Sequence, residues 1–228
     1  MKILAIDTSS ERGSIALLED DQVSVEFSQK LERQYSSNLV PMIEQVLAKA
    51  SVKLSEIEGY AVGVGPGSFT GIRVGITTVK GLALVTKKPV VGISSLLALA
   101  YNTSGGSYAV TPLVDAKRNL VYFAWYRPDQ NGKLSEQIPP TLGTIHEALS
   151  KINRVSLFIG DAVLKYRRNI LSSKREKAHF TDFSDPFPRA VFIGKIALEK
   201  FQKGKTDSIN SLAPTYLYSR YCSIGGNR

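Results

Sequence analysis

KILAIDTSSERGSIALLEDDQVSVEF, residues 2–27, is the stretch that decides the predicted fold. Its first apolar run ends at Asp7, a polar stretch with Gly13 follows, and Ser14–Leu18 is apolar again. After a second polar turn, Val23–Phe27 alternates between apolar and polar residues, which is the pattern of a half-buried strand. Three consecutive strands joined by short turns indicate an antiparallel meander.

Helical and strand patterns then alternate. Leu39–Ala50 has apolar residues at spacings of three and four, and a second helix is expected over residues 70–86. Tyr60–Val64 and Pro89–Ile93 are short apolar strands, and a last helix follows Ser94. The order β-β-β-α-β-α-β-α predicts an α/β fold in which helices cover a mixed sheet.

The second half partly repeats this opening. Thr111–Asp115 is an apolar strand that ends in aspartate, 108 residues after Asp7, and Leu120–Tyr126 and Leu134–Ile138 complete a second meander. We interpret the recurrence as a duplicated domain. The alternative is coincidence between two common strand–turn–strand patterns.

Ser and Gly cluster at 103–107, which marks a boundary between the halves. We therefore expect an N-terminal lobe over 1–104 and a smaller C-terminal lobe over 105–228. Helices are expected near 161–171 and 188–201, and part of the last helix is expected to pack back on the first lobe.

Composition is that of an ordinary globular protein: 228 residues, 43% hydrophobic and 21% charged. These values argue against disorder of the whole chain, and no apolar run is long enough to span a membrane. The single cysteine, Cys222, cannot form an internal disulfide, which fits a reducing compartment and an expected cytoplasmic location.

The net charge of +9 lies entirely after residue 150. Residues 151–180 hold eight Lys and Arg against two Asp and Glu, whereas residues 1–100 hold ten of each. Such a basic segment can attract RNA or an acidic protein partner. The alternative is a solvated lysine-rich surface.

Gly63–Arg73 is rich in glycine and joins a strand to a helix. It matches neither a Walker A loop nor the dinucleotide fingerprint, but N–H groups at the helix start could hold an anion. The alternative is a tight turn that lets the helix pack closely. Gly67, Gly71 and Gly75 form one helical ridge, which favours close approach of a second helix, either internal or from a partner chain.

Asp7, with Thr8 and Ser9, ends a strand beside a turn. Such a group can hold a Mg²⁺–nucleotide cluster, although the same residue types also close turns through local hydrogen bonds. The predicted nucleotide- or phosphate-binding set is therefore Asp7, Thr8, Ser9, Gly65, Gly67 and Ser68. His146 and His179 are the two histidines, with no metal-ligand spacing and no cysteine cluster, so we expect neither a metal site nor a catalytic residue.

Several blocks of this sequence resemble the TsaB family, also called YeaZ. The most specific is Gly-Pro-Gly-Ser-Phe-Thr-Gly-Ile-Arg at 65–73. The other matching blocks are Ile3–Ser9, Ala61–Val64, Val74–Gly75, Lys80–Ala83, Val91–Leu96, Asp115–Lys117 and Pro214–Leu217. The resemblance covers nearly the whole chain.

This resemblance implies an actin-like ATPase (ASKHA) fold of two RNase H-like lobes. It also implies a non-catalytic, essential role in adding threonylcarbamoyl to the tRNA adenosine next to the anticodon. The implied partners are a TsaD-like catalytic subunit, which this chain would bind and support, a TsaE-like ATPase and, through the complex, tRNA. No cofactor is expected to bind firmly to this chain, and ATP and a metal ion are expected on the partner subunits.

The resemblance further implies that the N-terminal helices bind the partner and, when the chain is alone, a second copy of it. The expected interface residues are Leu39, Met42, Ile43, Val46, Gly67, Gly71, Ile72 and Gly75. Tyr35, Lys117 and Leu120 depart from the family pattern, which puts polar roles at those positions in question. The rival hypothesis is an independent enzyme, either an actin-like-fold small-molecule kinase or a peptidase.

Overall fold

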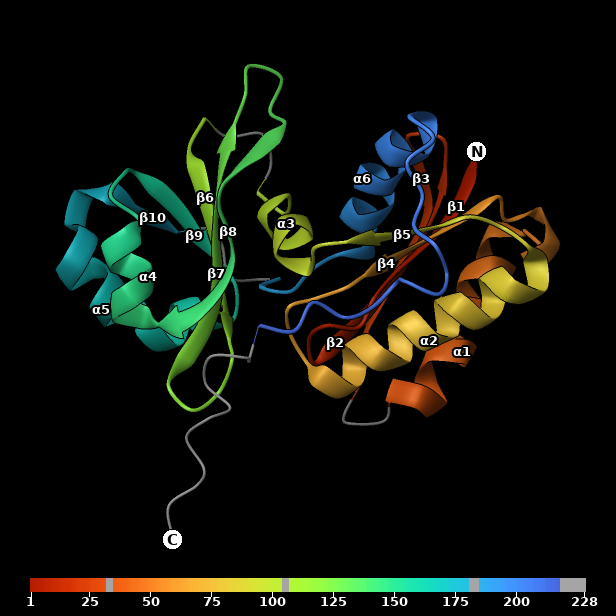
Figure 1. Cartoon of the computed structure of the whole chain (residues 1–228), viewed down its shortest axis with the longest axis horizontal. Helices are drawn as coiled ribbons and strands as arrows, with labels where there is room; N and C mark the ends of the chain where they lie inside the picture. The colour runs from red at the N-terminus through yellow and green to blue at the C-terminus, as the bar shows by residue number, and fades with distance from the viewer. Residues whose placement is uncertain (32–34, 104–106, 181–184, 218–228) are drawn as a thin grey trace, which may run out of the picture. The chain divides into compact units, whose positions relative to one another are not determined.

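The computed structural model describes residues 1–31, 35–103, 107–180 and 185–217, except the side chains of residues 35 and 36. It separates into two compact units (Figure 1). Unit 1 comprises Met1–Asn102 and Phe187–Pro214, and unit 2 comprises Thr103–Pro186 and Thr215–Arg228. The last helix thus belongs to unit 1, together with the N-terminal residues.

Unit 1 contains a five-stranded mixed sheet in the order β3-β2-β1-β4-β5. The first three strands form the predicted antiparallel meander, and β4 and β5 run parallel to β1. The elements are β1 Lys2–Asp7, β2 Arg12–Glu19, β3 Gln22–Lys30, α1 Tyr35–Ala50, η1 Leu54–Glu56, β4 Gly59–Gly63, α2 Phe69–Thr86, β5 Val90–Ile93, α3 Ser95–Ala100 and α6 Ala190–Gln202.

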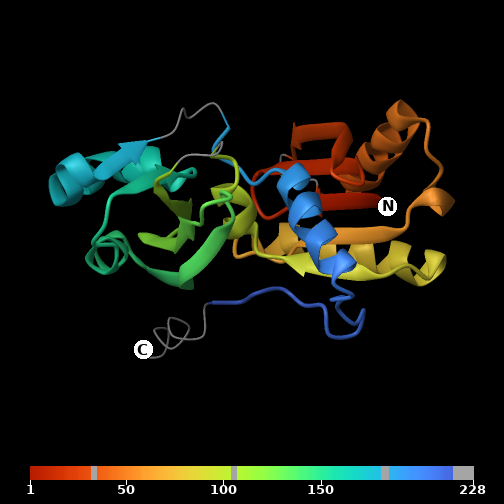
Figure 2. The ribbon, with the colours of Figure 1, turned by 90° about the horizontal axis from the view of Figure 1, so that it is seen from above.

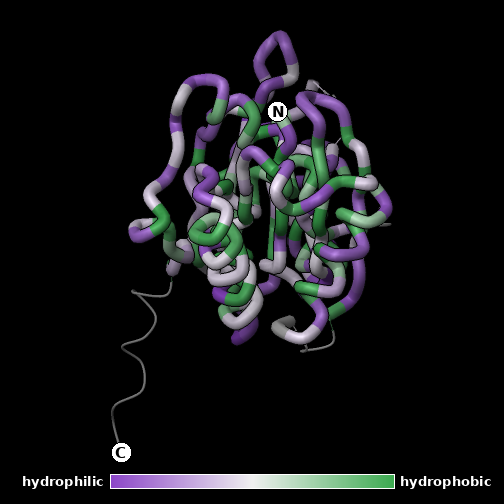
Figure 3. The backbone as a smooth tube through the Cα atoms, turned by 90° about the vertical axis from the view of Figure 1, so that its right-hand side faces the viewer, coloured by the Kyte–Doolittle hydropathy of each residue, from purple (hydrophilic) through white to green (hydrophobic). Residues whose placement is uncertain are grey.

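Two apolar clusters cover the two faces of this sheet, because alternate residues of β1 and β2 point to opposite sides. Leu4, Ile6, Ile15 and Leu17 pack under α1 and α2, whereas the intervening residues pack against α6. Figure 1 shows α1 and α2 side by side, and Figure 2 shows α6 running across the strands. In Figure 3 the hydrophobic colour gathers on the central strands, while the loops are mostly hydrophilic.

Unit 2 repeats the arrangement with the sheet order β10-β9-β6-β7-β8. Helices α4 and α5 cover one face through a core that includes Leu113, Phe123 and Phe158. The elements are β6 Ala109–Asp115, β7 Leu120–Pro128, β8 Leu134–Thr144, α4 Ile145–Lys151, β9 Ser156–Ile159, α5 Ala162–Lys174, η2 Arg175–Lys177 and β10 Ala178–Phe180. The duplication predicted from the two meanders is therefore present in the strand order.

No helix among the described residues is both long enough and apolar enough to cross a membrane. The predicted strand and helix positions agree with the structure within a few residues for most elements. Helix α4, strand β10 and the short 3-10 helices η1 and η2 were not predicted. The signal for α4 is a capping box, in which the Thr144 side chain accepts from Glu147 N and the Glu147 carboxylate accepts from Thr144 N.

Candidate functional site

Asp7 lies at the end of β1 and is completely buried. One carboxylate oxygen, Oδ1, accepts from the backbone N–H of Ser9 at 2.9 Å and from its hydroxyl at 2.7 Å. The other, Oδ2, accepts from the Ser95 hydroxyl at 2.7 Å, at the start of α3. Burial raises the pKa of Asp7 above its ordinary value, although the hydrogen bonds from Ser9 and Ser95 oppose this shift.

The glycine-rich loop between β4 and α2 is fastened to the same place. Gly65 N donates to the Ser95 hydroxyl at 3.2 Å, and Ser68 N donates to the Ser9 carbonyl at 2.6 Å. The Ser68 hydroxyl caps α2 by accepting from Gly71 N at 3.2 Å. These donors, which a phosphate would otherwise use, are therefore occupied by groups of the chain itself.

Two glycines are required by close approach in this cluster. A Cβ at Gly63 would lie closer than 3.0 Å to Asp7 Oδ2, and a Cβ at Gly67 would lie equally close to the Ser9 carbonyl oxygen. The hydroxyl of Thr8 donates to the Gly71 carbonyl at 2.7 Å and ties the turn after β1 to α2. We call Asp7, Ser9, Gly63, Gly65, Ser68 and Ser95 the Asp7 clasp.

The structure thus brings together the predicted phosphate-binding residues from two segments of unit 1. Whether they bind a phosphate stays a prediction. Among the residues that the structure describes, no group of three or more His, Cys, Asp or Glu side chains is placed to hold a metal ion.

The apolar residues expected at a partner interface lie on the inner sides of α1 and α2. Leu39, Met42, Ile43, Val46 and Ile72 are buried in the core of unit 1. Gly71 and Gly75 are also buried, and a Cβ at Gly75 would meet the Thr8 hydroxyl. In the described structure these residues therefore pack within unit 1, and their contact with a partner stays a prediction.

The outer side of α2 carries a different stripe. Thr77, Gly81, Leu84 and Val85 are exposed, and their spacings of three and four place them together on one face of the helix. Leu84 is 63% exposed and Val85 is 82% exposed, and a Cβ at Gly81 would have no neighbour within 4 Å. Helix α1 contacts α2 and carries the exposed apolar side chain of Val40.

Asp115 ends β6, the strand of unit 2 that corresponds to β1. Its carboxylate pairs with Lys117 at 3.1 Å and with Lys165 at 3.2 Å. Burial acts to raise the pKa of Asp115, but the hydrogen bonds from Lys117 and Lys165 outweigh it and lower that pKa. The lysine at 117 therefore keeps a polar role, while Leu120 begins β7 as a buried residue. The departure at Tyr35 concerns a side chain outside the described residues.

The basic segment 151–180 is not uniformly available to a partner. Lys165 is paired with Asp115, and the Arg167 guanidinium lies 4.2 Å from the centre of the Phe180 ring. A groove in unit 2 instead joins Arg154 and Lys177 of this segment to Trp125 and Arg127 of β7. Sequence patterns did not predict Trp125 as a candidate binding residue, because a single aromatic residue on a strand normally belongs to the core.

The repeated strand and helix order, with an aspartate at the end of the first strand in each unit, defines the actin-like ATPase fold of two RNase H-like lobes. YeaZ from Pseudomonas aeruginosa has this fold with a TM-score of 0.79 and 25% identity, covering 95% of this chain and 99% of that chain. The chain belongs to the TsaB family, as its similarity to curated relatives shows.

It is 31% identical to the tRNA threonylcarbamoyladenosine biosynthesis protein TsaB of Escherichia coli, over 95% of this chain and 94% of the relative. It is 30% identical to the protein of that name from Bacillus subtilis, over the same shares of the two chains. A TsaD family model, described as tRNA N6-adenosine threonylcarbamoyltransferase, matches residues 25–194.

Proposed function

We propose that this chain is a non-catalytic, essential subunit of a cytoplasmic complex that transfers threonylcarbamoyl to the tRNA adenosine next to the anticodon. It would act by binding a TsaD-like catalytic subunit, which a TsaE-like ATPase joins. The observation that carries the non-catalytic role is the Asp7 clasp. The carboxylate best placed for a nucleotide-bound cation is buried and already accepts three hydrogen bonds from Ser9 and Ser95.

The direct test is a tRNA-modification assay supplied with threonylcarbamoyl adenylate. The full set of partners should give product, and leaving out this chain should abolish most of it. The chain alone should give none. Product from the chain alone, at the rate of the full set, would overturn the proposal.

The variant Asp7→Asn tests in the same assay whether the charge of Asp7 is needed, because the amide keeps the size of the side chain and removes its charge. A supporting subunit with this change should sustain the modification rate within about twofold. A drop of about a hundredfold or more, with assembly intact, would indicate that Asp7 takes part in the chemistry.

The kinase and phosphate-site hypotheses are tested on the purified chain. Calorimetric titration with ATP and Mg²⁺ should give no saturable heat, and ATP turnover should match a blank. Saturable binding that Asp7→Asn or Ser68→Ala removes would establish the predicted phosphate site. Turnover with phosphorylation of a small-molecule acceptor would favour the kinase.

The proposed partner surface is the outer side of α1 and α2, centred on the exposed stripe of α2. Its apolar side chains and the small Gly81 allow another helix pair to approach closely. A second copy of the chain could occupy the same surface in the absence of the TsaD-like subunit. A stable contact of this kind should bury about 1,000 Å² or more in total.

Gly81→Leu tests this surface, since Gly81 is exposed and a Cβ at this position would have no neighbour within 4 Å. It should leave thermal stability unchanged or slightly higher, because leucine favours a helix over glycine by about 1 kcal/mol. It should weaken both self-association and partner binding at least tenfold. Leu164→Glu is the matched control, since Leu164 is an exposed leucine on α5 of unit 2 and should change neither. Normal partner binding by Gly81→Leu would place the interface elsewhere.

A further inference from the structure

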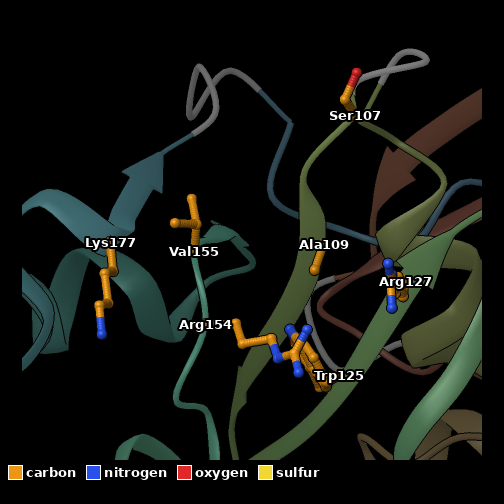
Figure 4. A pocket seen from close by; sticks show the side chains of 7 residues that line it. All are labelled: Ser107, Ala109, Trp125, Arg127, Arg154, Val155 and Lys177. Atoms are coloured by element: carbon orange, nitrogen blue, oxygen red, sulfur yellow. The ribbon is translucent and has the colours of Figure 1, made fainter.

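Unit 2 contains an open groove of about 490 Å³ at one end of its sheet (Figure 4). Sites that bind ligands of nucleotide or drug size span roughly 300–1,000 Å³. The groove is lined by Ser107, Ala109, Trp125, Arg127, Arg154, Val155 and Lys177.

Strand register brings these distant residues together. Ala109 of β6 pairs with Ser156 of β9, which in turn pairs with Ala178 of β10. Lys177 immediately precedes β10 and Arg154 lies two residues before β9, so both lie at this end of the sheet. On the other side of β6, Arg127 lies near the end of β7.

The lining is strongly cationic. It holds three basic side chains, Arg127, Arg154 and Lys177, and no carboxylate. All three residues are exposed, and none forms a salt bridge with another described residue.

Trp125 gives the groove an aromatic wall. It packs against the core beneath α4 and α5 on one side and lines the groove on the other. Its indole Nε1 is buried without a hydrogen-bond partner among the described groups, a cost that phenylalanine at this position would avoid. In Figure 4 the Arg154 side chain extends toward Trp125, so a cation and a ring border one space.

We propose that this groove binds an unpaired nucleotide of an RNA chain, with the base against Trp125 and the adjoining phosphates on Arg127, Arg154 and Lys177. Base–aromatic stacking tolerates any base, and guanidinium groups match phosphate geometry. An acidic peptide would use the cations but not the ring. A free mononucleotide would use the ring, but its single phosphate group would leave part of the three-cation lining unused. The proposal rests on the proposed function only in its choice of RNA as the ligand.

Trp125 is the only tryptophan in the chain, so its fluorescence reports on this groove alone. Titration of the full chain with a single-stranded 10-nucleotide RNA should quench the emission saturably. Three phosphate contacts predict a slope near −2 of log K against log salt, hence about a tenfold or greater loss of affinity from 50 to 200 mM salt. The chain is used without partners or adenylate, so failure here leaves the modification-complex proposal untouched.

Charge-reversal variants locate the contact, with anisotropy of labelled RNA as the readout. Arg154→Glu should weaken binding at least fivefold. Arg168→Glu is the matched control, because Arg168 is exposed on α5 in the same basic segment but outside the groove, and it should change affinity by less than twofold. Equal losses from the two variants would show diffuse attraction and overturn the groove.

Trp125→Leu should weaken RNA binding by about five- to a hundredfold, the range found for loss of one stacked base. Since this residue also packs on the core, thermal unfolding is measured alongside, and Arg154→Glu carries the test if the leucine variant unfolds.

Three competitors decide the ligand class: a duplex of the same sequence, AMP and polyglutamate. Each should compete at least tenfold more weakly than the single strand. If any one of them competes as strongly as the single strand, the result contradicts an unpaired RNA nucleotide as the occupant.

Discussion

The two units of this chain have the same topology but place their matching aspartates in opposite environments. Read from the outer antiparallel strand, the sheets run β3-β2-β1-β4-β5 and β8-β7-β6-β9-β10. Each first strand ends in aspartate, Asp7 in unit 1 and Asp115 in unit 2. The position of the carboxylate is thus a property of the fold.

The protonation behaviour of this carboxylate, in contrast, depends on the groups that surround it. Serine hydroxyls and a backbone N–H enclose Asp7, and burial raises its pKa, whereas two lysines lie beside Asp115 and lower its pKa. The difference teaches that a strand-end aspartate in this fold does not by itself define a nucleotide site. Substitutions in the two places should therefore change stability with opposite pH dependence.

The largest effect is expected from Gly63→Ala, which places a methyl group against the Asp7 carboxylate. The buried clasp cannot yield easily, so the free energy of unfolding should fall by about 3 kcal/mol, the upper part of the range for overpacking. Chemical denaturation measures it. Gly81→Ala is the control, since its Cβ meets nothing and should stabilise α2 by up to about 1 kcal/mol. A loss below about 1 kcal/mol for Gly63→Ala would mean that the clasp is loose.

Asp7→Asn should have the next largest effect, and it should be stabilising at neutral pH. Because the pKa of Asp7 is raised by burial, the folded chain holds this proton more tightly than the unfolded chain. Wild-type stability is therefore lost as the pH rises from the ordinary value of 3.8 through the raised pKa. Asparagine has no such pH-dependent loss, so the stability of the variant relative to wild type should rise between pH 3 and pH 7.

That gain should disappear at pH 3, where the wild-type carboxyl is protonated in both states. Paired urea denaturation curves at the two pH values measure the difference directly. A variant that is less stable than wild type by the same amount at both pH values would show a geometric defect, with no contribution from the buried charge.

Sequence patterns predicted both meanders and both aspartates because alternation and polar turns are local signals. They did not predict β10, a three-residue strand that is defined only by its pairing with β9. Helix α1 contains Pro41, which lies in the second turn because the helix begins at Tyr35. Burial of Leu39 and Met42 on the opposite side outweighs a proline cost of about 3 kcal/mol.

The candidate sites were predictable only in part. Periodicity identified the apolar stripes of α1 and α2, but it could not say whether a partner or the chain's own sheet covers them. In the structure the sheet does, since Leu4 and Ile6 need a covering layer. The groove at Trp125 depends on register between strands that are far apart in the sequence, and no local pattern contains that information.

The smallest effect is expected from Asp115→Asn, and its sign should be opposite to that of Asp7→Asn. The lysines lower the pKa of Asp115, so its stabilising contribution is present above 3.8 and is lost as the pH falls through the lowered value. The carboxylate side chain is 15% exposed and Lys117 is 80% exposed, so solvent screens the pairs and the loss at pH 7 should be about 0.5 kcal/mol. It should shrink in 1 M salt and at pH 3. Glu56→Gln is the control for an ion pair of the same 3.1 Å length, because Glu56 pairs with Lys2 in unit 1 and its side chain is 43% exposed. A pH-independent loss of 2 kcal/mol or more for Asp115→Asn would make Asp115 a structural residue like those of the Asp7 clasp, and the contrast between the units would fail.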